Sequence, residues 1–164
     1  MTTKENGMEY LWAPWRIEYI KKADEVGCIF CRKPTEENDA ANYILHRGQY
    51  NFIIMNSYPY NSGHLMIAPY RHVANLDELT DEELNEHFRM VSRVVTVLKQ
   101  VFKADGFNIG MNLGRVAGAG IDKHIHTHIV PRWAGDTNFM PVIADTKVIN
   151  EALEETYKKL MGKL

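Results

Sequence analysis

The chain has 164 residues and a formal net charge of −2, with 45% hydrophobic and 24% charged residues. This composition is that of an ordinary globular protein, and the length is enough for one domain with its own core. A net charge this close to zero provides no overall field that would attract nucleic acid. The sequence contains neither an apolar run near the roughly 18 residues of a membrane span nor a signal-peptide pattern. A cytoplasmic protein without nucleic-acid or membrane partners is therefore expected.

The first 27 residues are expected to form an arm, with a short helix at about 15–22 that Pro14 would open. Cys28 and Cys31 are the only cysteines. A Cys-x-x-Cys pair in a chain of this size indicates a metal site or a redox centre rather than a structural disulfide. A thioredoxin-like redox centre would need a βαβ unit around the pair, and none is predicted. A zinc site would need two further ligands from elsewhere in the chain.

The middle of the chain reads as strands followed by a long helix. After a polar connector at 33–42, short strands are predicted at 43–46, 52–55 and 64–68, and together they would form an antiparallel meander. A helix is predicted over 76–104, because Thr80 and Glu83 have the spacing of a capping box. Apolar residues then recur at helical spacing: Leu84, Phe88, Val91, Val95, Leu98 and Phe102. A helix of this length has to pack across the sheet, which makes the fold class α+β.

A strand is predicted at 107–113, followed by the glycine-rich loop 114–120. Glycines let backbone N–H groups approach phosphate oxygens closely, so this loop is a candidate anion cradle. A final helix is predicted at about 146–161. Its expected packing face consists of Val148, Leu153, Tyr157 and Leu160.

Three histidines alternate with β-branched residues in His124-Ile125-His126-Thr127-His128-Ile129-Val130. Side chains of a strand alternate between its faces, so a strand over 124–130, ended by Pro131, would place the three imidazoles on one face. Three unrelated histidines are not expected in such a row, because each buried imidazole needs a hydrogen-bond partner. Two chemistries remain: a three-His catalytic zinc site, or an imidazole nucleophile whose neighbours orient it or protonate a leaving group.

The pattern His124-x-His126-x-His128 resembles the signature of the histidine triad (HIT) superfamily of nucleotide hydrolases and transferases. Segments 56–66, 69–73 and 131–136 also resemble HIT segments and occur in the same order. The opening 11–16 and the stretch 133–148 resemble a bacterial branch that contains diadenosine tetraphosphate phosphorylases and is related to the fragile-histidine-triad hydrolases. The resemblance implies a single HIT domain over 1–164, with an arm at 1–27, the HIT core at 28–133 and a C-terminal extension at 134–164.

The resemblance also implies roles for individual residues. His126 would attack the α-phosphorus of a nucleotide and form a covalent nucleotidyl intermediate, His128 would protonate the leaving group, and His124 would complete the triad. A structural zinc ion is implied, and no catalytic metal. Its ligands would be Cys28, Cys31, His72 and His124. The substrate-binding residues implied are Asn56, His64, Asn112, Gly118, Ala119, Gly120 and Trp133, of which Trp133 would contact the distal nucleotide. Phe52 and Met55 are candidates for the wall against the base, although core packing explains them equally well.

Two positions separate this chain from other branches of the superfamily. Gly120 occupies the place of a glutamine with which the fragile-histidine-triad hydrolases grip the polyphosphate bridge, and His128 stands where the uridylyltransferase relatives have glutamine. The favoured function is phosphorolysis of dinucleoside polyphosphates such as diadenosine tetraphosphate, with inorganic phosphate as the acceptor, by a homodimer. The alternatives are a hydrolase of the same substrates, an adenosine phosphoramidase, a three-His zinc hydrolase, and a non-catalytic nucleotide-binding protein.

Overall fold

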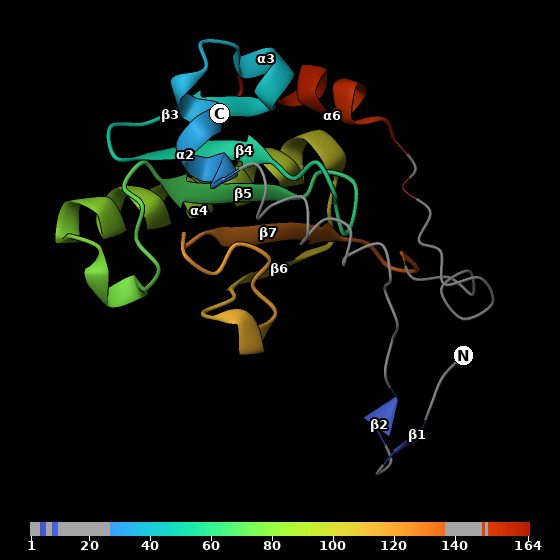
Figure 1. The fold of residues 1–164 in the computed structure, drawn as a ribbon. Coiled ribbons are helices and arrows are strands. Elements are labelled where there is room, and N and C mark those ends of the chain that lie inside the picture. Colours follow the sequence, from blue (N-terminus) through green and yellow to red (C-terminus); the bar gives the residue numbers. More distant parts are fainter. Residues whose placement is uncertain (1–3, 6–7, 10–26, 137–148, 150) are drawn as a thin grey trace.

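The protein is built on a five-stranded antiparallel sheet with the strand order β3-β4-β5-β7-β6 (Figure 1). The computed structural model describes residues 4–5, 8–9, 27–136, 149 and 151–164. The predicted arm helix, segment 11–16 and most of the C-terminal extension up to Val148 lie outside these residues. The strands are β3 (Ile44–Arg47), β4 (Asn51–Met55), β5 (Leu65–Pro69), β6 (Gly106–Met111) and β7 (Thr127–Arg132). Two further strands, β1 (Lys4–Glu5) and β2 (Met8–Glu9), pair with each other in a separate two-stranded sheet.

The predicted α+β class is confirmed, and β3, β4 and β5 form the predicted antiparallel meander, but the remaining two strands do not extend it in chain order. Strands β3, β4 and β5 follow one another, whereas β7 inserts between β5 and β6. The chain reaches the far edge of the sheet through the helical segment that follows β5, and it then returns toward the centre. This return places the histidine-bearing strand β7 inside the sheet, where both of its edges are paired.

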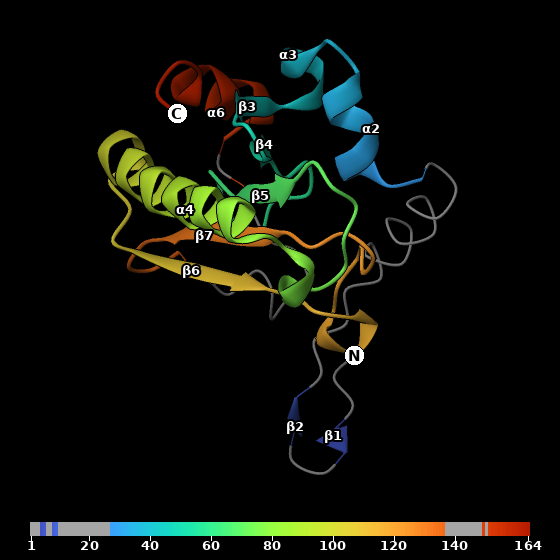
Figure 2. The same cartoon turned by 90° about the vertical axis from the view of Figure 1, so that its left-hand side faces the viewer.

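Helix α4 (Asp81–Phe102) covers one face of the sheet (Figure 2). The predicted capping box is present, since the side chain of Thr80 accepts from Glu83 N and that of Glu83 accepts from Thr80 N. The helix starts later than predicted because 76–78 form a separate 3-10 turn, η1 (Leu76–Glu78). The core on this face joins α4 to the sheet and to α6 (Leu153–Leu160), through Ile53, Leu65, Ile67, Val94, Leu98, Ile129, Tyr157 and Leu160. None of the helices in the described ranges is long and apolar enough to cross a membrane.

The predicted polar connector at 33–42 is wrong, because it holds helical residues. Helix α2 (Ile29–Thr35) begins directly after Cys28, and α3 (Asp39–Asn42) is capped by Asn38, whose side chain accepts from Ala41 N. Both helices are too short for an apolar periodicity to reveal them. Phe30 of α2 packs on the sheet face opposite α4, against Ile44, Phe52, Ile54, Met66 and Ala68.

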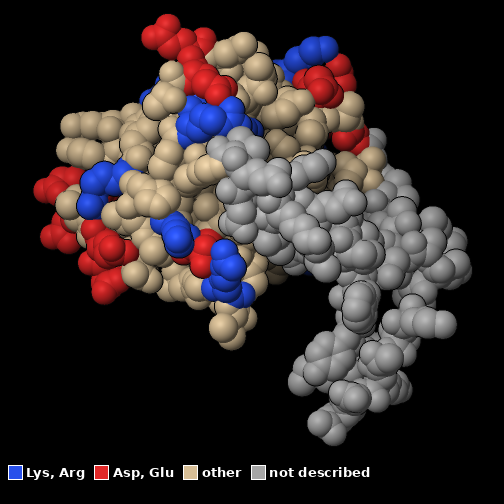
Figure 3. All heavy atoms as spheres, in the orientation of Figure 1, with Lys and Arg blue, Asp and Glu red and all other residues tan. Residues whose placement is uncertain are grey.

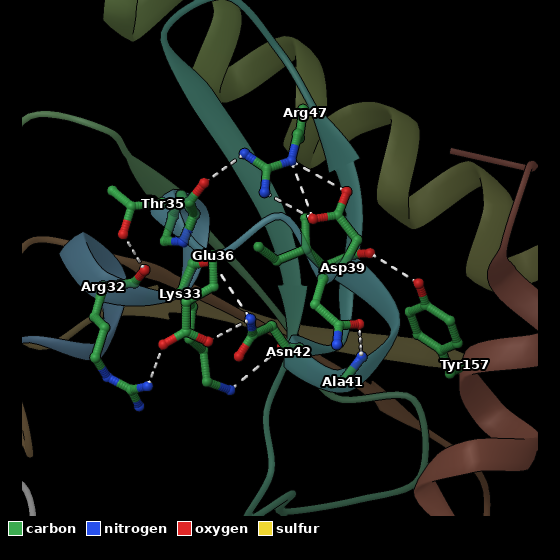
Figure 4. Close-up of polar contacts among 12 residues, drawn as sticks. Arg32, Lys33, Thr35, Glu36, Asp39, Ala41, Asn42, Arg47 and Tyr157 are labelled. Carbon is green, nitrogen blue, oxygen red and sulfur yellow. Dashed lines mark hydrogen bonds and ion pairs between the residues drawn. The ribbon is translucent and has the colours of Figure 1, made fainter.

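Polar contacts bind this helical corner to β3 (Figure 4). Arg47 donates to both carboxylate oxygens of Asp39 and to the carbonyl of Pro34 at 2.8 Å. Asn42 donates to the Glu36 carboxylate at 2.9 Å. The corner therefore holds α2, and with it Cys28 and Cys31, at a fixed place over the sheet.

Strand β7 runs from 127 to 132 instead of the predicted 124–130, and Pro131 lies inside it. In an antiparallel strand, the N–H and the carbonyl of the same residue point toward the same neighbouring strand. The direction of the Pro131 carbonyl therefore shows where its N–H would have pointed. The Pro131 carbonyl accepts from Asn61 Nδ2 at 3.0 Å, on the side where the pairing of β5 with β7 has already ended at Ile129. The missing N–H of Pro131 is therefore not needed by either ladder, and the strand continues beside β6.

Candidate active site

The imidazoles of His126 and His128 lie on the sheet face opposite α4. His128 stands opposite Met66, which belongs to the core on the α2 side, while Ile129 belongs to the core under α4. The predicted alternation is therefore correct for these two residues. His124 precedes the strand and is fully buried.

The ring of His126 is oriented by the backbone. Its Nδ1 lies 2.8 Å from the carbonyl oxygen of His124, which can only accept, so Nδ1 carries the hydrogen. Burial lowers the pKa of His126 below its ordinary value, although the bond to the His124 carbonyl acts in the opposite direction. The ring of Phe30 lies 4.7 Å from that of His126 and contributes to this burial. His126 is consequently a neutral imidazole whose Nε2 holds a lone pair.

In the ring of His128 the hydrogen is on the other nitrogen, Nε2, instead of Nδ1. The backbone N–H of Tyr60 donates to His64 Nδ1 at 3.1 Å, so in the neutral ring the hydrogen of His64 is on Nε2. His64 Nε2 in turn lies 2.9 Å from His128 Nδ1, which accepts this hydrogen. Neutral His128 therefore carries its own hydrogen on Nε2.

The two rings form a complementary pair. Their centroids are 4.8 Å apart, at an interplanar angle of 72°. His126 presents a basic Nε2 and His128 a protonated one. A nucleophile and a general acid that act on neighbouring atoms of one substrate need this arrangement.

Both ring nitrogens of His124 have partners outside this pair. Nε2 donates to the carbonyl of Pro69 at 2.8 Å, and Nδ1 faces Cys28 Sγ at 3.3 Å and His72 Nδ1 at 3.2 Å. The triad residue His124 thus contributes its backbone carbonyl to His126, and its ring belongs to a different cluster. Because the backbone accepts from Nε2, Nδ1 keeps the lone pair that a metal ligand needs.

Cys28, Cys31, His72 and His124 form one potential metal site, with their ligand atoms all within 4.8 Å of one another. Cys31 Sγ lies 3.2 Å from His72 Nδ1 and 3.5 Å from His124 Nδ1. At the usual bond lengths, a tetrahedron around zinc has edges of about 3.4 Å between two nitrogens and about 3.6 Å between nitrogen and sulfur. Burial, together with the hydrogen bond and charge of Cys28, raises the pKa of Cys31 to about 11. A cation is therefore what would hold the Cys31 sulfur as a thiolate.

The geometry disfavours a three-His catalytic metal. Within the described part of the chain, the group whose ligand atoms converge is the Cys₂His₂ set, and it includes neither His126 nor His128. The Nδ1 atoms of these two rings are engaged by the His124 carbonyl and by His64.

Two of the predicted substrate-binding residues lie beside the imidazole pair. His64 contacts His128, and Asn56 Nδ2 lies 3.3 Å from His64 Nδ1. The backbone N–H of Tyr58 donates to Asn56 Oδ1 at 2.9 Å. The ring of Tyr60 stacks on that of His64 at 4.8 Å. The loop between β4 and β5 thus brings these groups to the triad.

The predicted phosphate loop is closed by its own hydrogen bonds. Asn112 Nδ2 donates to the Gly118 carbonyl at 3.3 Å, around the 3-10 turn η2 (Arg115–Ala117). Gly118 has a φ of 86°, which favours glycine at this position. Ala119 is buried and Gly120 is half-buried.

Other predicted residues are placed elsewhere. The indole N–H of Trp133 donates to the carbonyl of Phe102, the last residue of α4, at 3.1 Å, so the structure does not bring it to the imidazole pair. Phe52 and Met55 are fully buried in the two cores on opposite faces of the sheet. Two residues near the site were not predicted. The position of Phe30 between the two cysteines could have indicated it, whereas nothing in the sequence indicated His87 of α4 except that it is a polar residue on a buried helix face.

The HIT domain family matches residues 37–135, which is more than half of the chain. The chain belongs to the HIT family. An AP-4-A phosphorylase of Mycobacterium tuberculosis is 38% identical over 161 residues, covering 93% of this chain and 83% of that protein. A bis(5'-adenosyl)-triphosphatase of Saccharomyces cerevisiae is 33% identical over 91 residues, covering 55% of this chain and 44% of that protein. A structure of a hypothetical histidine triad nucleotide-binding protein from Sulfolobus tokodaii superposes with a TM-score of 0.64 and 31% identity, covering 81% and 86% of the two chains.

These findings confirm the predicted family and the predicted HIT-type enzyme. Both curated relatives are enzymes by name, and both names refer to diadenosine polyphosphates. The HIT core predicted at 28–133 overlaps nearly all of the matched residues.

Proposed function

We propose that this HIT protein transfers the adenylyl group of a dinucleoside polyphosphate through a covalent adduct on His126. The observation that carries this proposal is the complementary pair of Nε2 atoms. In the first step the lone pair of His126 Nε2 forms a bond to the α-phosphorus, and the bond from this phosphorus to the bridging oxygen breaks. The Nε2–H of His128 is placed to protonate the departing oxygen, a contribution of about 10²–10⁴ in rate.

The second step returns the histidine to its free form. We propose that an oxygen of inorganic phosphate attacks the adenylyl phosphorus and displaces His126 Nε2. With diadenosine tetraphosphate the first step releases ATP and the second releases ADP. Phosphate is favoured over water because the relative that covers 93% of this chain is named a phosphorylase. Gly120 also stands where the hydrolases, by the resemblance, carry the glutamine that grips the polyphosphate bridge. Hydrolysis is the second candidate, because the yeast relative is named a triphosphatase.

We propose that the substrate is held by the residues that the resemblance implies, of which Asn56 and His64 lie beside the imidazole pair. Asn56 and His64 would hold the ribose, while Asn112 and the 118–120 segment would lie along the phosphates. The N–H groups of Gly118 and Ala119 already donate to the carbonyls of Arg115 and Gly114, at 2.9 and 3.4 Å, so a phosphate would have to displace these bonds to be held by them. Direct contact of Trp133 with the distal nucleotide has less support, since its indole N–H is engaged at the end of α4.

We propose that the Cys₂His₂ group holds a structural zinc ion. Zinc in such a closed set supplies folding energy and no open coordination position. The donor atoms fit such a set, since the spacings of 3.2–3.5 Å between nitrogen and sulfur and of 3.2 Å between the two nitrogens lie within about 0.4 Å of the edges of a zinc tetrahedron. Cys28 and Cys31 would tie α2 to His124, and the carbonyl of His124 orients His126.

We propose a cytoplasmic homodimer formed from a single domain over 1–164. The outer edge of β6 pairs with no other strand among the described residues, and Ile109 and Leu113 expose 47% and 45% of their surface there. The packing of Leu160 and Leu164 into the α4 core supports a single domain. Reduced Cys28 and Cys31 fit a reducing compartment. Light scattering would contradict the dimer if it gave the mass of one chain.

We also propose that nucleic acid is not a partner. On the part of the surface that Figure 3 draws in colour, Lys and Arg side chains are scattered singly or in small groups, and Asp and Glu side chains gather over η1 and the start of α4. A binding surface for nucleic acid would need a continuous basic stripe.

The test is to incubate the protein with diadenosine tetraphosphate, with and without inorganic phosphate, and to separate the nucleotides. ADP plus ATP, formed only with phosphate, is the expected result. AMP plus ATP without phosphate would identify a hydrolase. No product in either case would contradict the proposal and leave an adenosine phosphoramidase or a non-catalytic nucleotide-binding protein.

A further inference from the structure

A buried polar chain joins helix α4 to the residue that stands between the two reactive imidazoles. His87 of α4 is fully buried, and its Nε2 lies 2.6 Å from Thr127 Oγ1. Thr127 is 1% exposed and separates His126 from His128 in the sequence. On the other side of the His87 ring, Nδ1 lies 2.9 Å from Asn51 Oδ1. The catalytic steps proposed above do not use this contact.

The contacts of Asn51, at the far end of this series of hydrogen bonds, determine which group donates and which accepts in each bond. Asn51 Nδ2 donates to the Glu83 carbonyl at 3.1 Å and to the Glu86 carboxylate at 3.0 Å, so Asn51 Oδ1 faces His87. An amide oxygen only accepts, and His87 Nδ1 therefore carries the hydrogen. The Nε2 of the neutral ring accepts, and the Thr127 hydroxyl donates to it. Burial lowers the pKa of His87 to about 4, which keeps the ring neutral near pH 7.

The series of hydrogen bonds ends at the turn between β3 and β4. The Glu86 carboxylate accepts from the backbone N–H groups of Gln49, Tyr50 and Asn51, at 2.7, 2.8 and 2.7 Å. Burial alone would raise the pKa of Glu86, but these bonds and that from the Asn51 side chain hold it below its ordinary value. Thr127 is thus connected, across α4, to the β3–β4 turn on the far side of β5.

A buried hydrogen bond of this kind adds little net stability compared with an apolar pair of the same shape. The bond between His87 and Thr127 instead fixes the orientation of the residues that it joins. The hydroxyl of Thr127 has one acceptor, so the bond fixes the rotation of β7 at this residue. Side chains alternate along a strand, and the same rotation therefore sets the directions of His126 and His128 on the opposite face.

We propose that His87 is a positioning residue for catalysis. Acting through Thr127 Oγ1, it holds the start of β7 in the rotation at which His126 donates to the His124 carbonyl and His128 accepts from His64. The proposal rests on the proposed function of the imidazole pair. It predicts that the polar contact matters for the rate rather than for binding, because a misplacement near 1 Å costs about 10²-fold in rate.

The first test compares two substitutions at one position, with diadenosine tetraphosphate and phosphate as substrates. Thr127→Val keeps the branched shape and removes the hydroxyl, whereas Thr127→Ser keeps the hydroxyl and removes a methyl group. The valine variant should lose about 10- to 100-fold in kcat with KM within about threefold, and the serine variant should stay within about threefold in kcat. Equal kcat values for the two variants would overturn the proposal.

The second test separates positioning from stability. Thr127→Val leaves His87 Nε2 without its donor and should lower the melting temperature, so its loss of kcat has to be compared with that of a variant destabilised elsewhere. The same loss of kcat in a destabilised control would show a merely structural role. Tyr157→Phe is the matched control, because it loses a buried hydrogen bond to the Ile44 carbonyl far from β7. It should lower the melting temperature and leave kcat unchanged.

The third test requires no turnover. Ring nitrogen shifts of His126 and His128 in the substrate-free protein report which nitrogen carries the hydrogen. In Thr127→Val these signals should shift or broaden relative to wild type, and in Thr127→Ser they should not. Unchanged signals in both variants would overturn the proposal. Absence of turnover in the wild type would contradict the proposed function, while the ring shifts would still decide whether His87 positions the pair.

Discussion

His126 and His128 have the same side chain, and their hydrogen-bond partners make them chemically different. A backbone carbonyl accepts from Nδ1 of His126, whereas His64 donates to Nδ1 of His128. The difference at Nδ1 determines which Nε2 is basic and which is protonated. No carboxylate is needed to orient His126, because the His124 carbonyl has this role.

Replacement of His126 by Ala should abolish turnover of diadenosine tetraphosphate, with a loss of at least about 10⁴-fold, because the covalent step has no other nucleophile. Nucleotide affinity should change little, since the imidazole contributes to bond formation rather than to recognition. Steady-state kinetics and equilibrium binding of a non-cleavable analogue measure the two effects. His46→Ala, on β3, is the matched control and should behave as wild type. Substantial residual turnover of the His126 variant would rule out this residue as the nucleophile.

At the scale of an element, α4 is both an apolar packing helix and a polar anchor. Three polar residues of α4 each bind a different segment around the sheet. Glu83 binds Arg71 after β5, Glu86 binds the β3–β4 turn, and His87 binds Thr127 on β7. The sequence predicted the capping box and the approximate length of this helix. It predicted the buried face in part, since Val91 and Leu98 lie in the core, whereas Phe88 is 51% exposed and the polar His87 is fully buried. The partners of these polar residues are 12 to 40 positions away in the chain, and helical periodicity cannot reveal them.

The Glu83 carboxylate should make stability depend on acid pH. Hydrogen bonds from Arg71 at 2.7 Å lower the pKa of Glu83 from 4.5 to about 2, against the effect of burial. The folded protein therefore binds this proton less readily than the unfolded chain. The contribution of the ion pair is complete above pH 4.5 and is lost as the pH falls from about 4.5 toward about 2.

Glu83→Gln should lower the free energy of unfolding at pH 7 by about 1–3 kcal/mol, and the difference from wild type should shrink below pH 4.5. Urea unfolding at a series of pH values measures it. Glu82→Gln, one residue earlier and exposed, is the control and should change stability by less than about 0.5 kcal/mol. A constant difference between Glu83→Gln and wild type down to pH 3 would contradict this assignment.

At the scale of the whole molecule, the site depends on segments far apart in the sequence. The cysteines lie before and within α2, His72 follows β5 and His124 precedes β7. The resemblance to HIT proteins predicted this cluster, and the strands were predicted from their apolar residues. The insertion of β7 between β5 and β6 was not predicted, because strand order depends on crossover connections that leave no local pattern. Short α2 and α3 were missed for a similar reason, since contacts with β3 and the sheet stabilise them.

Removal of a bound zinc ion should affect stability before it affects chemistry. The purified protein should carry about one zinc per chain, and Cys31→Ser should lower this content. A chelator should lower the melting temperature, because α2 loses its link to His124. Metal analysis and thermal melts measure the two effects. A protein that stays fully folded under chelation but loses turnover at once would indicate a catalytic metal instead.

The most direct test of the central claim is to trap the covalent intermediate. Enzyme mixed with diadenosine tetraphosphate without phosphate, and quenched in alkali, is digested and analysed by mass spectrometry. The account predicts one adenylyl group on the peptide that contains His126, and its disappearance when phosphate is added before the quench. Turnover without such an adduct, or an adduct on another residue, would contradict the assignment of His126 as the nucleophile.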